Sequence, residues 1–171
     1  MPANYLEQLV SEWYEYQGYF VRRNVLVGKR AKGGHECELD VVAFHPARKH
    51  LVQVEPSMDA DSWAVRQKRY EKKFRAGKKY ASGLFVGLGA PLVPDQIALF
   101  GYGSGRTQKT VGDGTVMTIR DFLRPILAEL GTRAIGRRAV PEHMVILRTI
   151  QILRECRDDL RVLWERKRGR G

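Results

Sequence analysis

The clearest alternation of apolar and polar residues predicts two neighbouring strands between residues 33 and 57. The chain there reads GGHECELDVVAF, then a polar turn HPARKH, then LVQVEPS. Alternate residues of a strand share a face, so the acidic positions 36, 38 and 40 are expected on one face, and positions 53, 55 and 57 likewise. The apolar back face comes from both runs: Leu39, Val41, Ala43, Leu51, Val52 and Val54. If the two runs pair as a hairpin, Asp40 and Glu55 project from the same side of one sheet.

Periodicities elsewhere predict further elements on both sides of this hairpin. Helical spacing of apolar residues predicts a helix over 3–17, followed by Gly18, and a second helix over 63–76. A third helix is expected to end near Leu130, and Pro125 should kink it or restart it. A last, long helix is expected over 141–167. The remaining runs predict strands over 19–27, 83–88, 96–102 and 115–119.

These elements predict an α/β protein with a mixed sheet flanked by helices. A length of 171 residues fits one domain with room for a modest extra element. We therefore expect an α/β domain over 1–131 and a basic helical extension over 132–171. The pattern leaves two roles open for the long C-terminal helix. It packs on its own domain, or it forms a homodimer or binds a partner.

Composition points to a polyanionic partner. The formal net charge is +11, the pI is near 10, and the positive charge is concentrated in residues 66–79 and 133–170. Such a balance favours nucleic acid or an anionic membrane surface. No apolar run is long enough to span a membrane, and no basic-then-apolar leader opens the sequence. Two cysteines are too few for a disulfide framework, so a reducing cytoplasmic setting is expected.

The basic residues best placed for nucleic acid lie in the loop GKRAKGG and in the second helix. Lys68 and Lys72 form a like-charged i,i+4 pair with only Glu71 to offset them, and a phosphate backbone would relieve that repulsion. The expected nucleic-acid contacts are Lys29, Arg30, Lys32, Arg66, Lys68, Arg69, Lys72 and Lys73.

The paired carboxylates point to a divalent cation. Asp40 and Glu55 would repel each other on rigid strands, and hard oxygen ligands of this kind suit Mg²⁺. Glu7 lies beside the apolar stripe of the first helix and is the glutamate of that helix expected to face a site, whereas Glu12 and Glu15 are expected in solvent. A zinc site built from His35, Cys37, His45 and His50 is disfavoured, because their spacing fits no finger or ribbon pattern.

In this order, the motifs resemble the PD-(D/E)XK nuclease superfamily, nearest to archaeal-type Holliday-junction resolvases and related small endonuclease-like proteins. The resemblance covers residues 3 to about 100. It rests on Glu7 in the first helix, Gly18-Tyr19 entering the first strand, GGHECELD ending at Asp40, and LVQVEPS containing Glu55. It implies the restriction-endonuclease-like three-layer core and a metal-dependent phosphodiesterase acting on DNA.

The resemblance also implies roles for individual residues. Asp40, Glu55 and the backbone carbonyl of Pro56 would hold Mg²⁺ or Mn²⁺, and Glu7 would act on the metal through water or help to orient it. Gln53 lies on the Glu55 face and is a candidate to support a carboxylate or a water molecule.

Ser57 departs from the family pattern, which has lysine at this position. Serine carries no charge to position a nucleophile, and losing such a group commonly costs about a hundred- to a thousand-fold in rate. Three outcomes follow: a lysine of the next helix substitutes, with Lys68 or Lys72 the candidate; the metal alone sustains slow cleavage; or the protein binds DNA without cutting it.

The third outcome is a different class of function, a non-catalytic nucleic-acid-binding module of the same fold. Ser57 favours that reading, whereas the retained set Glu7, Asp40 and Glu55 favours the enzyme. RNA stays open as a substrate. A further alternative is an assembly subunit that dimerises through residues 141–167.

Overall fold

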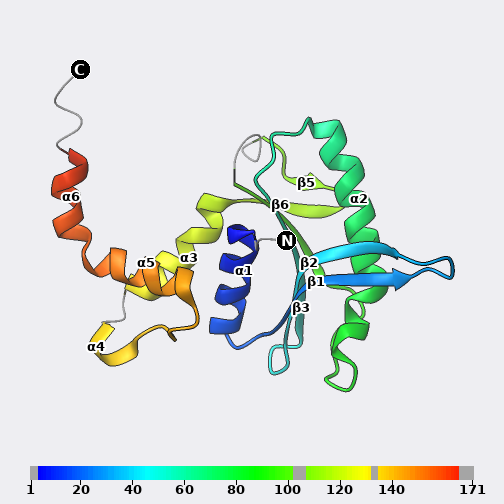
Figure 1. The fold of residues 1–171 in the computed structure, drawn as a ribbon, viewed down its shortest axis with the longest axis horizontal. Helices are drawn as coiled ribbons and strands as arrows, with labels where there is room; N and C mark the ends of the chain where they lie inside the picture. The colour runs from blue at the N-terminus through cyan, green and yellow to red at the C-terminus, as the bar shows by residue number, and fades with distance from the viewer. Residues whose placement is uncertain (1–3, 102–106, 132–134, 166–171) are drawn as a thin grey trace. The chain divides into compact units, whose positions relative to one another are not determined.

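The structure, a computed structural model, describes residues 4–101, 107–131 and 135–165. Its contacts divide the chain into two compact units, Met1–Phe122 and Leu123–Gly171. The first unit is an α/β structure with a six-stranded mixed sheet between helices (Figure 1). The second unit consists of helices in its described part. The division falls inside the helix α3 (Ile119–Gly131).

The sheet combines an antiparallel half with a parallel half. Its strands, in spatial order, are β1 (Phe20–Lys29), β2 (His35–His45), β3 (His50–Ser57), β4 (Asp95–Phe100), β6 (Gly114–Thr118) and β5 (Thr110–Val111). β1, β2 and β3 pair antiparallel, β3 with β4 and β4 with β6 pair parallel, and β5 pairs antiparallel with β6. The predicted hairpin at residues 33–57 is confirmed as the β2–β3 pair.

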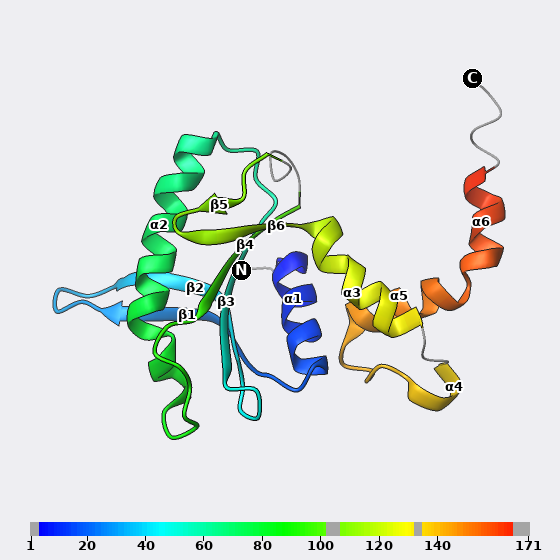
Figure 2. The same cartoon turned by 180° about the vertical axis from the view of Figure 1, so that it is seen from behind.

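One helix covers each face of the sheet. α1 (Tyr5–Tyr16) lies on one side and α2 (Trp63–Tyr80) on the other, as both Figures 1 and 2 show. α1 begins where the Asn4 side chain accepts a hydrogen bond from the backbone N–H of Leu6 at 3.1 Å, the usual way to satisfy a free donor at a helix start. Leu6, Leu9 and Val10 bury its apolar face.

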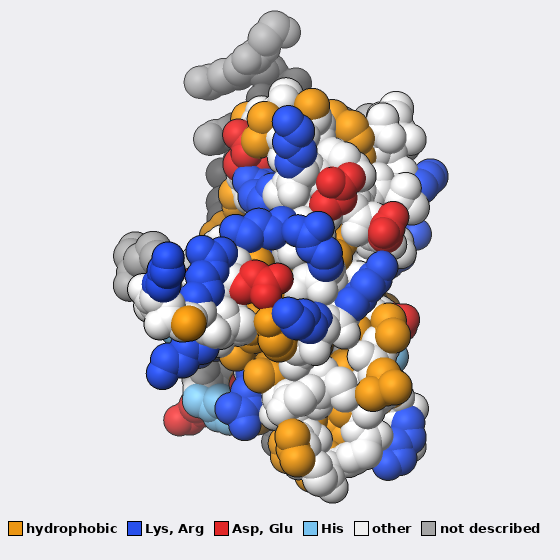
Figure 3. Space-filling view, turned by 90° about the vertical axis from the view of Figure 1, so that its right-hand side faces the viewer, with side chains coloured by type: hydrophobic (Ala, Val, Ile, Leu, Met, Phe, Trp, Pro, Cys, Tyr) orange, Lys and Arg blue, Asp and Glu red, His pale blue; other side chains and the backbone are white. Residues whose placement is uncertain are grey.

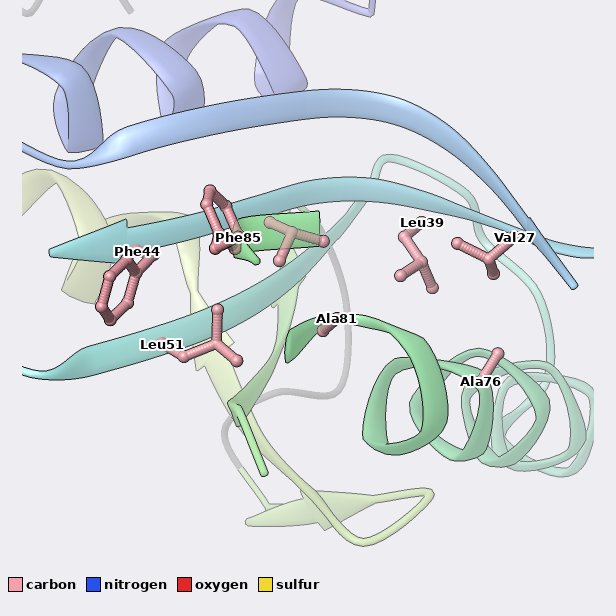
Figure 4. Packing of buried hydrophobic residues seen from close by; sticks show 8 residues of the cluster. Val27, Leu39, Phe44, Leu51, Ala76, Ala81 and Phe85 are labelled. Atoms are coloured by element: carbon pink, nitrogen blue, oxygen red, sulfur yellow. The ribbon is translucent and has the colours of Figure 1, made fainter. Parts of the chain in front are cut away.

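Apolar side chains fill the space between the sheet and α2 (Figure 4). One cluster lies toward the end of α2 and the short 3₁₀ helix η1 (Ser82–Phe85), and it contains Val27, Leu39, Val42, Phe44, Leu51, Ala76, Ala81 and Phe85. A second cluster lies under the middle of α2 and contains Tyr70, Phe74, Ala98, Phe100 and Val111. These clusters fix how α2 lies over the sheet, and so where its inward-facing polar side chains end up.

The strict alternation expected along residues 36–40 is interrupted at Asp40. Leu39 and Val42 are three residues apart and would point to opposite faces of a regular strand, yet both belong to the same cluster. The cause lies in β1, where Asn24 has φ 52° and is left out of a register that pairs Arg23 with Val41 and Val25 with Leu39. A left-handed residue changes the course of its strand, so β1 and β2 switch faces together at this point.

Two expected elements differ in the structure. The strand over 83–88 is wrong: the chain forms η1 and then turns, with Gly87 and Gly89 at φ 82° and 71° and Val86 84% exposed. Glycines in the left-handed region interrupt an extended run. The short strand β5 lies where no strand was expected.

The second unit corrects the expectation of one long C-terminal helix. Its described part contains α4 (Ile135–Arg138), α5 (Val145–Glu155) and α6 (Arg157–Glu165). The helix ends at Cys156 and restarts with Asp158 and Asp159 in the first turn, because acidic residues are favoured at the positive N-terminal end of a helix. α3 runs through Pro125 without ending there. None of the helices in the described ranges has the length and apolar character needed to cross a membrane.

Candidate functional site

A pocket of about 300 Å³ opens in the first unit where β2, β3 and α2 meet. The residues that line it come from these elements, from the start of α1 and from the loop after β3. They are Asn4, Asp40, Glu55, Pro56, Ser57, Met58, Asp59, Arg69, Tyr70 and Lys73. Two charged groups dominate the pocket, one around Lys73 and one around Arg69.

The first group is an ion-pair triad. The ammonium of Lys73 donates to Oδ1 of Asp40 at 2.5 Å and to Oε2 of Glu55. Asp40 and Glu55 therefore lie on the same side of the sheet, as the hairpin pattern predicted. The backbone N–H of Asp40 also donates to Oε1 of Glu55 at 3.4 Å. A single cation thus offsets the repulsion between two carboxylates.

The helical repeat explains why Lys73, and not its neighbours, enters the pocket. Arg66, Arg69 and Lys73 lie at i, i+3 and i+7, on the side of α2 that faces the sheet. Lys68 and Lys72 are exposed on a different side of α2. The surrogate expected from Lys68 or Lys72 is therefore not placed near Asp40 and Glu55; Lys73 is.

Burial makes the triad strongly interacting. Glu55 is 1% exposed and the side chain of Lys73 is 20% exposed. Removal from water raises the pKa of Glu55, and the neighbouring Asp40 raises it further, while Lys73 opposes both effects. Burial lowers the pKa of Lys73, but Glu55 and Asp40 outweigh that effect, so the net shift is upward. The lysine is therefore held in its charged form.

A relay of two buried amides orients Glu55. Nε2 of Gln96 donates to Oε1 of Gln53 at 2.7 Å, and Nε2 of Gln53 donates to Oε1 of Glu55 at 2.7 Å. The same two amide nitrogens also donate to the backbone carbonyls of Phe74 and Lys73. Every donor in the relay thus has its partner, and the carboxylate of Glu55 is fixed in one orientation. Gln96 was missed from the sequence, where its only signal is a polar residue within an apolar strand.

Glu7 approaches the triad from α1. Burial raises the pKa of its carboxyl group, and the charge of Asp40 raises it further. The side chain of Asn4 and the charge of Lys73 act in the opposite direction. Glu12 differs from expectation: it is 5% exposed and accepts a hydrogen bond from Gln8 at 2.9 Å. Glu15 is exposed, as expected.

The second charged group holds the loop after β3 against α2. Asp59 accepts from the guanidinium groups of Arg66 and Arg69 and from the hydroxyl of Ser57. Arg69 also donates to Asp61 at 2.9 Å, and Arg66 is 3% exposed, with its guanidinium 4.6 Å from the ring centroid of Phe100. Burial raises the pKa of Asp59, but the hydrogen bonds from Ser57 and Arg69 prevail and lower it to about 2. Ser57 thus belongs to this second group and not to the Lys73 triad.

The other basic residues singled out from the sequence lie outside the pocket. Lys29, Arg30 and Lys32 are exposed at the tip of the β1–β2 hairpin. A band of Lys and Arg side chains, with a few acidic side chains among them, covers the side of the first unit on which this hairpin and α2 lie (Figure 3). The expected nucleic-acid contacts therefore divide into an inward set (Arg66, Arg69 and Lys73) and an exposed set (Lys29, Arg30, Lys32, Lys68 and Lys72).

The donor set of the pocket fits a hard cation with few protein ligands. The carboxylates of Asp40 and Glu55 border it together with Pro56, and two carboxylates with water suffice for Mg²⁺ in many sites. In the described part of the chain, no group of three or more His, Cys, Asp and Glu side chains is arranged to hold a metal ion. A cation bound here would take over contacts that Lys73 now makes.

Comparison of the chain with protein-family models, with curated proteins and with solved structures gives no match.

Proposed function

We propose that this protein is a divalent-metal-dependent nuclease that hydrolyses phosphodiester bonds in DNA. The observation that carries the proposal is the position of Lys73, whose ammonium lies between Asp40 and Glu55 in an open pocket. The chain thereby has the two carboxylates and the cation that the PD-(D/E)XK pattern requires, although position 57 holds serine. The lysine comes from α2 instead of β3.

The arrangement of elements also supports a restriction-endonuclease-like fold. α1, then the antiparallel strands β1–β3, then α2 and the parallel strand β4 form three layers in the order that this fold uses. Asp40 lies on β2 and Glu55 on β3, at the point where the antiparallel half of the sheet meets the parallel half.

Residues in and beside the pocket have distinct parts in this proposal. Bound Mg²⁺ or Mn²⁺ would lower the pKa of a water molecule and stabilise charge on the phosphate. Asp40 and Glu55 would hold the cation, with the carbonyl of Pro56 as a third ligand. Lys73 moves from the carboxylates toward the phosphate and offsets the negative charge that develops there. Glu7 orients water at the site, and Gln53 keeps Glu55 in place.

The test is cleavage of labelled linear, nicked and four-way-junction DNA by the full chain with Mg²⁺ or Mn²⁺. Wild type is expected to cut at least one of these substrates. Glu55→Gln should abolish cutting, and Lys73→Met should lower the rate about a hundred- to a thousand-fold. Lys78→Met removes an exposed lysine from the same helix, away from the pocket, and is the matched control, expected within about threefold of wild type.

Two outcomes would contradict the proposal. One is the absence of metal-dependent cleavage of every substrate by folded wild type. The other is cleavage that survives Glu55→Gln, which would indicate a contaminating nuclease or a different site. An equal loss of rate in Lys78→Met and Lys73→Met would remove the special role of Lys73.

A non-catalytic nucleic-acid-binding module is the second candidate, and the same triad gives it support. Lys73 already neutralises Asp40 and Glu55, so the buried carboxylates are satisfied without a metal ion. In that case DNA binding by wild type is expected to be sensitive to salt and indifferent to Mg²⁺, and cleavage should not occur.

A further inference from the structure

The exposed side of α2 carries a row of cations that is separate from the pocket. Lys68, Lys72, Arg75 and Lys79 follow one another at spacings of four, three and four residues. At about 100° per residue they lie within about 60° of one another around the helix axis, and their row is about 16 Å long. All four are exposed. We call these four residues the outer ridge.

The outer ridge points away from the inward cations of the same helix. Lys73 and Arg69 lie roughly 100–140° around the axis from Lys68, and both are ion-paired in the pocket. Arg69 lies nearer to the ridge, about 60° from Lys72, but its guanidinium is held by Asp59 and Asp61. A phosphate group on the ridge therefore does not reach the ammonium of Lys73, and the stretch of polyanion on the ridge differs from the one that would enter the pocket.

Most of the positive charge on the ridge is not neutralised by the protein. Within the described ranges, Lys68, Lys72 and Arg75 make no hydrogen bond or ion pair through their side chains, whereas Lys79 lies 3.6 Å from Glu36. The nearby acid Glu71 accepts from Gln67 at 2.8 Å, and Asp113 lies 3.7 Å from Lys78. Like charges at i,i+4 on a helix repel each other. The ridge is thus an energetic cost to the free protein that a bound polyanion removes.

The ridge continues toward a second group of exposed cations. The hydroxyl of Tyr80 donates to Glu36 at 2.8 Å, which ties the end of α2 to β2 beside the hairpin tip. That tip carries Lys29, Arg30 and Lys32. Basic side chains form a band over this side of the first unit (Figure 3). A double helix carries about one negative charge per 1.7 Å of its axis, so a band of this length would face several phosphate groups.

We propose that the outer ridge binds the phosphate backbone of double-stranded DNA, at a surface distinct from the pocket. This proposal rests on the proposed function only because both take DNA as the partner. Binding at the ridge needs neither a metal ion nor cleavage. A substrate that fills both surfaces presents two separate stretches of backbone to two different sides of α2. The ridge therefore supplies affinity and orientation, and the pocket supplies the chemistry.

The experiment measures equilibrium binding of the full chain to a labelled 20-base-pair DNA duplex at several salt concentrations, with divalent cations chelated. The variant Lys68→Gln/Lys72→Gln/Arg75→Gln lowers the net charge from +11 to +8, since 11 − 3 = 8. The matched control Arg22→Gln/Arg23→Gln/Arg48→Gln makes the same change at exposed positions elsewhere in the first unit. Neither set contributes to the pocket or the core.

The ridge variant is expected to reduce the slope of log affinity against log salt by about 2 to 3, because each lost phosphate contact removes about 0.9. The slope of the control should differ from that of wild type by no more than about 0.9, the value of one contact. An equal reduction in ridge variant and control would overturn the proposal, as would wild type that does not bind the duplex. If wild type binds DNA through the ridge but never cleaves it, the nuclease proposal is contradicted and the ridge proposal stands.

Discussion

The backbone of Gly77 in α2 lies against the side chain of Gln53 in β3, with no room for a Cβ atom between them. Gln53 is fully buried and holds Glu55 in place. A glycine on the helix thus permits the close approach that the amide relay needs. Within a helix, glycine is otherwise about 1 kcal/mol less favourable than alanine.

Gly77→Ala is therefore expected to destabilise the protein, although the same change in an ordinary helix position stabilises it. The new methyl group displaces Gln53, which leaves buried polar atoms of the relay without partners, at a cost of about 1–3 kcal/mol. Urea unfolding measures the change. Gly83→Ala is the control, since a Cβ there meets nothing within 4 Å. A Gly77→Ala variant as stable as wild type would show that Gln53 can move without cost.

Lys73 and Glu55 are expected to be strongly coupled in stability. Lys73→Met leaves two carboxylates facing each other without a cation, and breaking a buried ion pair commonly costs about 3–5 kcal/mol. In a Glu55→Gln background only Asp40 loses its partner, so the same substitution should cost clearly less. Unfolding of wild type, both single variants and the double variant gives the coupling directly. Additive losses would mean that the two side chains do not interact in solution.

Lys73→Met should also make the protein more responsive to Mg²⁺. With the ammonium gone, Asp40 and Glu55 are free to bind a cation that favours the folded state, and stabilisation follows the ratio of free metal to its dissociation constant. The expected result is a larger rise in melting temperature with added Mg²⁺ for Lys73→Met than for wild type. Asp40→Asn/Lys73→Met removes one carboxylate and should lose the response. A response that persists in this double variant would place the metal elsewhere.

Alternation and helical spacing predicted much of the first unit, because burial on one face leaves a periodic signal. The helix ending before Gly18, the hairpin that brings Asp40 beside Glu55, and the basic helix after Ser62 all followed from it. Two adjacent runs of alternating residues sufficed to place both carboxylates.

Such reasoning could not identify which lysine of α2 belongs to the site. Moving one residue along a helix turns a side chain by about 100°, so choosing among Lys68, Lys72 and Lys73 requires the angle at which α2 lies on the sheet. That angle is set by core contacts, such as those of Tyr70 and Phe74, that are distant in sequence. The interruption at Asn24 and the role of Gln96 depend on strand pairing in the same way.

Asp59 should make stability depend on pH at the acidic end. Its folded-state pKa of about 2 lies below the ordinary 3.8, so ionised Asp59 stabilises the fold above about pH 4, and this contribution is lost as pH falls toward 2. A shift of that size corresponds to at most about 2.5 kcal/mol, and partial exposure reduces it to about 1–2 kcal/mol. Asp59→Asn should therefore be less stable than wild type at pH 7, and the difference in free energy of unfolding should narrow between pH 4 and pH 3.

Urea unfolding of both proteins at pH 7, 5, 4 and 3 measures this difference. Asp61→Asn removes a more exposed partner of Arg69 and is the control, expected to show a smaller loss at pH 7. A gap between wild type and Asp59→Asn that stays constant down to pH 3 would contradict the role of Asp59 as the anion that joins Arg66, Arg69 and Ser57.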